Sequence, residues 1–118
     1  MISVAVICWL LLIHFIADFI CQTEWMANNK SLALPPLILH VLVYGIVLMG
    51  AFTPVIGFVS ATLFGTVNLV LHFCTDYVTS RVMRRLKEKE NIRGFFQVLG
   101  IDQLIHGWCL VYTLWLFT

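Results

Sequence analysis

The chain has 118 residues, of which 61% are hydrophobic and only 11% are charged. A soluble domain carries about 25% charged residues, so this composition excludes an ordinary soluble enzyme and indicates a membrane protein. The length allows one domain, and the net charge of +1 gives no sign of a nucleic-acid partner.

Four apolar stretches follow one another along the chain: residues 2–21, 34–52, 55–78 and 95–117. Each has roughly the 20 residues that cross a hydrocarbon core of about 30 Å as a helix. Lipid cannot satisfy backbone polar groups, and the runs lack the alternation of barrel strands. The sequence therefore predicts an all-α fold, with residues 1–118 forming a single antiparallel bundle of four transmembrane helices.

The connections between these stretches set the predicted topology. Pro35 and Pro36 suit the first turn of the second helix, and Thr53-Pro54 suits a tight hairpin between the second and third. All seven Lys and Arg lie in two connections, 22–33 and 79–94. The excess of basic residues in cytoplasmic loops predicts that both connections face the cytoplasm and both termini the other side. We therefore expect a multi-pass protein of the inner, cytoplasmic membrane.

All four His and all three Asp lie inside the apolar stretches. Each such group costs about 2.5–3.5 kcal/mol at a helix centre if charged, so a shared functional site is the economical explanation. Residues four apart lie on one helix face, and all seven fall roughly one to three turns from the predicted cytoplasmic ends. They are His14, Asp18, His40, His72, Asp76, Asp102 and His106.

Imidazole and carboxylate in a dry pocket are typical ligands of a divalent metal ion, whose charge also offsets that of the carboxylates. We expect zinc, with manganese or iron as alternatives, bound as one ion with supporting residues or as two ions. Paired haems fit poorly beside three aspartates. A metal-free proton relay and a hydrogen-bonded packing core remain open. The expected supporting or substrate-contacting residues are Gln22, Glu24, Tyr44, Asn68 and Gln103.

The segment from His14 to Lys30, with Asp18, Gln22 and Trp25-Met26-Ala27 between them, resembles the opening of a bacterial and phage family of small membrane proteins. This family is known as domain of unknown function 3307. His40 and the His-Asp pairs of the later stretches also match its pattern, so the resemblance covers nearly the whole chain. It implies a four-helix membrane protein and no particular activity.

The two His-x3-Asp pairs also resemble the intramembrane zinc site of cation diffusion facilitator transporters. Those transporters usually have six spans and a cytosolic domain, which this chain lacks. The resemblance therefore implies ligand chemistry at His14, Asp18, His72 and Asp76, and not a shared fold.

Three functions are consistent with these patterns. The first is a membrane-embedded, metal-dependent hydrolase that opens to the cytoplasm. The second is a metal-ion or proton transporter, which the nearly apolar outer halves of the stretches disfavour for a single chain. The third is a structural or interaction protein with a polar packing core. Beside the bilayer, the candidate partners are a second copy of the chain and anionic lipid at the basic residues of 81–93.

Overall fold

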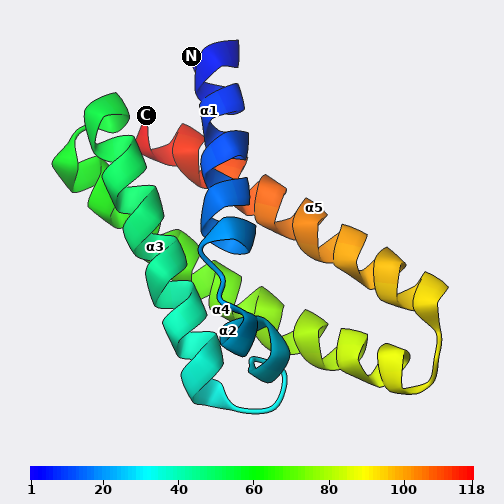
Figure 1. Ribbon diagram of the computed structural model, residues 1–118. Coiled ribbons are helices and arrows are strands. Elements are labelled where there is room, and N and C mark those ends of the chain that lie inside the picture. The colour runs from blue at the N-terminus through cyan, green and yellow to red at the C-terminus, as the bar shows by residue number, and fades with distance from the viewer.

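The computed structural model describes residues 1–118 and is entirely helical (Figure 1), which confirms the predicted all-α class. The elements are α1 (Val4–Phe15), a π-helical turn η1 (Ile16–Ile20), α2 (Glu24–Asn29), α3 (Leu34–Ile56), α4 (Phe58–Glu88) and α5 (Ile92–Phe117). Both termini and the α3–α4 turn lie toward one end of the molecule. The α2–α3 and α4–α5 connections lie toward the other (Figure 1).

The apolar run predicted one continuous α-helix over residues 2–21, but the structure has the α-helix α1 followed by the π turn η1. Ser3 caps α1, its Oγ accepting a hydrogen bond from the Val6 amide at 3.3 Å. The last turn widens into η1, where the Cys21 amide donates to the Ile16 carbonyl at 2.8 Å, five residues back. A π turn holds one more residue than an α turn, and such turns are frequent at functional sites. Asp18 lies within it.

The connection at 22–33 contains the short helix α2. The Thr23 hydroxyl caps this helix by accepting from the Met26 amide at 3.2 Å. Met26 is buried, which anchors α2 to the rest of the fold. The segment predicted as a loop is therefore a structured element, and it directs Lys30 toward the interior.

The α3–α4 turn differs from the predicted hairpin. Pro35 and Pro36 occupy the first turn of α3 as expected, but the helix continues through Pro54 to Ile56. The chain reverses at Gly57, whose φ of 82° lies in the left-handed region that glycine adopts without strain. The turn thus depends on the glycine rather than on Thr53-Pro54.

Most of the predicted 79–94 loop is helical. Helix α4 runs on to Glu88 and has 31 residues, a length of about 46 Å, which exceeds the roughly 30 Å of a hydrocarbon core. The basic residues near its end are therefore held on a rigid element. The Asn91 side chain then caps α5, its Oδ1 accepting from the Gly94 amide at 2.9 Å.

A buried apolar core lies between the termini and the polar residues. It is centred on Leu10, Leu48, Phe52, Phe64 and Leu110. In each helix, these apolar residues are nearer than the His and Asp to the end of the molecule that holds both termini. The His and Asp therefore lie between this core and the basic end.

The outer surface is largely apolar, with Trp108, Trp115 and Ile46 each more than 60% exposed. By length and composition, two helices are long and apolar enough to cross a membrane, α3 and α4, while the apolar stretch over Val4–Ile20 is shorter.

Candidate metal centre

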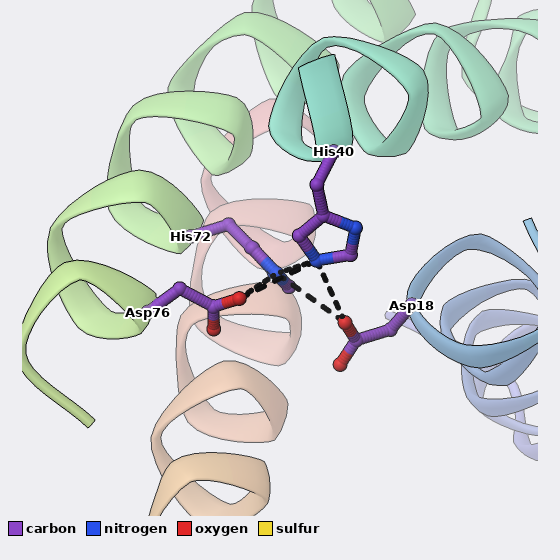
Figure 2. Close-up of side chains that lie close together, drawn as sticks. All are labelled: Asp18, His40, His72 and Asp76. Carbon is purple, nitrogen blue, oxygen red and sulfur yellow. Dashed lines mark hydrogen bonds and ion pairs between the residues drawn. The ribbon is translucent and has the colours of Figure 1, made fainter. Parts of the chain in front are cut away.

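Four buried side chains from three elements point toward one another in Figure 2. Asp18 comes from the π turn η1, His40 from α3, and His72 and Asp76 from successive turns of α4. None is more than 4% exposed. The wide turn at η1 and the four-residue spacing on α4 thus direct ligand atoms from separate helices to one point.

The five distances in this group that involve an imidazole nitrogen fit a tetrahedral metal ion. The Nε2 atoms of His40 and His72 are 3.0 Å apart. Asp18 Oδ1 lies 3.2 Å from His40 Nε2 and 3.4 Å from His72 Nε2. Asp76 Oδ2 lies 3.4 Å and 3.3 Å from the same two nitrogens. Ligands about 2.0–2.1 Å from a central ion in a tetrahedron are about 3.3–3.4 Å apart, close to these separations.

Hydrogen bonds alone account poorly for this arrangement. His40 Nε2 faces another imidazole nitrogen and two carboxylate oxygens, all within 3.4 Å. A single proton on one nitrogen cannot bond to all of them. The Nδ1 atoms of His40 and His72 are buried without a hydrogen-bond partner, so no second contact selects a tautomer. A cation at the centre would satisfy the four facing atoms together and offset the buried carboxylates.

A second group of three candidate ligands adjoins the first. Asp102 and His106 of α5 join Asp18, with ligand atoms within 4.8 Å of one another. His106 Nε2 is 3.3 Å from Asp102 Oδ2 and 3.0 Å from Asp76 Oδ1. The two groups therefore share Asp18, and Asp76 turns one oxygen toward each. Thr79 donates a hydrogen bond to Asp102 Oδ1 at 2.5 Å and fixes that carboxylate.

The second group borders a cavity of about 150 Å³. The residues that line it include Asp18, Asp102, Gln22 and Gln103. The Gln22 Oε1 atom is buried there without a partner. This side of the centre can therefore admit a small ligand, whereas the His40 and His72 side is closed.

His14 and Gln103 hold the carboxylates in place. The His14 ring accepts from the Tyr44 hydroxyl at Nδ1 and donates to Gln103 Oε1 from Nε2, each at 2.9 Å. The Gln103 amide donates to Asp18 Oδ2 at 3.0 Å and to Asp102 Oδ2 at 3.1 Å. His14 Nε2 is 3.8 Å from Asp18 Oδ2, and neither ligand group includes His14. These residues fix the orientation of the two carboxylates, as hydrogen-bonded neighbours do around the ligands of metal sites.

Of the other predicted supporting residues, one contacts the centre and two do not. The Tyr44 ring lies 4.0 Å from the His72 ring, centroid to centroid, and so contacts the centre directly. Asn68 is buried one turn before His72 but bonds to the Phe64 carbonyl and the Thr113 hydroxyl, outside the centre. Glu24 is exposed at the start of α2 and contacts none of the ligands.

Lys30 was expected to end the family-like motif and to help set the topology, but it also contacts the site directly. Its Nζ lies 2.8 Å from Asp76 Oδ2, and its side chain is only 14% exposed. A lysine held against a buried carboxylate supplies one of the charges that the site needs. The sequence contains one hint of this role, because Lys30 is the only basic residue in the 22–33 connection.

Comparison with curated proteins and with solved structures finds no match to this chain. The comparison with protein families does find one, over residues 6–118. That match covers the helices that carry all seven His and Asp residues, and it agrees with the resemblance noted in the first motif. The chain therefore belongs to the family described as protein of unknown function DUF3307.

Proposed function

We propose that this protein is a multi-pass protein of the inner membrane that binds divalent metal ions, zinc first, and uses them to hydrolyse a substrate reached from the cytoplasm. The single observation that carries the proposal is the set of separations among Asp18, His40, His72 and Asp76. These lie between 3.0 and 3.4 Å for the five pairs that include an imidazole nitrogen.

In the proposed membrane arrangement, α1 with η1, α3, α4 and α5 each span the bilayer. Helix α2 and the basic end of α4 face the cytoplasm, and both termini face the other side. All seven basic residues lie within 22–33 and 79–94, the two segments at this end of the molecule, which supports this orientation. The exposed apolar side chains on the outside of the bundle support contact with lipid.

The two ligand groups suit different tasks. Four protein ligands fill the tetrahedron of the first group, which is the pattern of a closed, structural site. The second group has three ligands, Asp18, Asp102 and His106, and borders the cavity, which is the pattern of a catalytic site. These three residues would hold an ion, which would supply activated water for hydrolysis when bound. Gln103 keeps the two carboxylates at fixed positions on the cavity wall.

Transport is less well supported by the same residues. A conduit needs polar groups through the full thickness of the membrane. Beyond the His and Asp, the interior is closed by Leu10, Leu48, Phe52 and Phe64, none of which has measurable exposure. A site reached from one side is therefore the better account for a single chain.

Metal analysis of the purified protein tests the proposal. Wild-type protein purified in mild detergent should contain at least one equivalent of metal by mass spectrometry. His72→Ala and Asp76→Ala should lose it, because each removes a ligand from the closed group. Asn68→Ala is the matched control, since Asn68 is equally buried on the same helix but bonds outside the centre.

A well-folded wild-type protein without stoichiometric metal, even after growth with added zinc, would contradict the proposal. The His and Asp residues would then form a packing core or a proton relay. If Asn68→Ala lost metal as completely as the ligand variants, the site would be sensitive to general destabilisation and the assignment of ligands would fail.

A further inference from the structure

A second hollow, of about 310 Å³, lies beside the metal centre against α2 and α4. Its charged side chains are all basic: Lys30 from the end of α2, and Arg84 and Lys87 from the extension of α4. Asn28, Ser31 and Ser80 add polar groups, and no acidic residue lines it. The hollow therefore offers hydrogen-bond donors and positive charge, with no carboxylate among its own lining residues.

Two of these polar groups have no partner within the protein. Ser80 is only 4% exposed, and its Oγ makes no hydrogen bond. The Nε of Arg84 is also buried without a bond, because the nearest acid, Glu88, places its Oε1 4.0 Å away. Buried donors without partners are rare in proteins and cost stability. A ligand with several acceptor oxygens would satisfy both.

The hollow and the cavity at the metal centre adjoin each other. Lys30, Ala27, Met83 and Phe95 line both. Lys30 also contacts Asp76 directly, so one side chain connects the basic hollow to the metal ligands. A group bound in the hollow is thus held next to the open side of the second ligand group.

We propose that this hollow binds a phosphate group and presents a phosphoester to the metal centre. Arginine and lysine with hydroxyl and amide donors are the residues that recognise phosphate, whose oxygens accept bonds from all of them. The binding stands on the hollow alone, while the reaction rests on the proposed function. Hydrolysis would join a water oxygen to phosphorus, break the bond from phosphorus to the leaving alcohol oxygen, and transfer one proton to that oxygen.

The phosphate can belong to a lipid headgroup or to a soluble phosphoester, and the experiment separates the two. Protein in detergent is titrated with inorganic phosphate by calorimetry. Protein in nanodiscs of phosphatidylcholine, with or without phosphatidic acid, is titrated in the same way. Phosphate binding that phosphatidic acid blocks would assign the hollow to a lipid headgroup. Phosphate binding that phosphatidic acid leaves unchanged would assign it to a soluble phosphoester.

Variants test whether the hollow is the site. Arg84→Gln should weaken phosphate binding about 10- to 100-fold, as expected for loss of a hydrogen bond between charged groups. Ser80→Ala should weaken it about fivefold, as expected for a neutral donor. Arg81→Gln is the matched control, because Arg81 is on the same helix but its guanidinium lies over the Tyr77 ring, outside the hollow. It should change binding less than about twofold.

Equal effects of Arg84→Gln and Arg81→Gln would overturn the proposal, as would a wild type that binds no phosphate in either form. His72→Ala separates this proposal from the metal site, because His72 does not line the hollow. Phosphate binding that survives in His72→Ala supports the hollow even if the metal site fails. A wild type that holds metal but binds no phosphate overturns the hollow and leaves the metal site standing.

Discussion

Replacing Lys30 with methionine should tighten metal binding at the first ligand group. Lys30 Nζ lies 2.8 Å from Asp76 Oδ2, the same oxygen that the tetrahedral group directs at the ion. An ion about 2.0–2.2 Å from that oxygen, at an ordinary carboxylate angle, lies about 4 Å from the ammonium. Methionine keeps most of the length and apolar contact of the side chain and removes its charge.

The repulsion can be estimated from that separation. Two unit charges 4 Å apart interact by about 1 kcal/mol in water, and by about 4 kcal/mol at the lower effective dielectric near a protein surface. A divalent ion doubles this, so even the aqueous limit gives about 2 kcal/mol, or about a 30-fold gain in affinity. Because the lysine side chain is only 14% exposed, the aqueous value is a lower bound.

The assay is a zinc titration in detergent, in competition with a chromophoric chelator of known affinity. Lys87→Met is the matched control, since Lys87 lines the basic hollow without contacting a metal ligand. It should change zinc affinity less than about threefold, because a surface charge is screened by salt. The same Lys30→Met variant should bind phosphate more weakly, so the two ligands should respond in opposite directions.

Unchanged or weaker zinc binding by Lys30→Met would refute the reasoning, provided that its helical circular dichroism and gel-filtration profile match the wild type. Such a result would mean that the ion does not bind at Asp76 Oδ2. A gain of equal size in Lys87→Met would also refute it, because the effect would then come from net charge.

Other predictions concern the second ion, the helix packing and the topology. In protein saturated with metal and phosphate, Asp102→Asn should reduce the metal content from two ions to one, because it changes only the three-ligand group. Gly65→Ala should lower the free energy of unfolding by about 1–3 kcal/mol, because its methyl group would lie 2.9 Å from the Gly45 carbonyl oxygen. Gly100→Ala, with no atom within 4 Å of the new methyl group, should unfold at the wild-type temperature or slightly above it. Alkaline phosphatase fused at the C-terminus should be active, and inactive when fused within 22–33; the reverse pattern would contradict the proposed orientation.

The convergence of the His and Asp residues was predictable from two features of the sequence, the four-residue spacing and the placement of the basic residues. A spacing of four residues places His72 and Asp76 on one face of a helix. The basic segments mark the cytoplasmic end of each helix, and so the depth at which each His and Asp lies. The structure brings these side chains together as expected, with oxygens of Asp18 and Asp76 each within 3.4 Å of the imidazole nitrogens of His40 and His72.

Other features could not be predicted from periodicity. A π turn over Ile16–Ile20 has the same apolar composition as an α turn, so the sequence gives no sign of it. The apolar pattern of α4 stops where the charged residues begin, so hydrophobicity did not predict that the helix extends to Glu88. It stays helical because arginine, leucine, lysine and glutamate are good helix formers. The position of Lys30 depends on how α2 docks through Met26, which is a tertiary contact.

The charges of the site connect the metal proposal to the phosphate proposal. With neutral imidazoles, Asp18, Asp76 and Asp102 carry three negative charges and Lys30 carries one positive charge. One divalent ion in the closed group brings this buried set to neutrality. A second ion in the three-ligand group leaves an excess of two positive charges, which is costly away from water. A phosphoester dianion in the adjoining hollow cancels that excess. The second ion and the phosphate should therefore strengthen each other's binding by the same factor, as linkage requires. On this account the closed ion is the resident one, and the open group fills fully only when substrate is present.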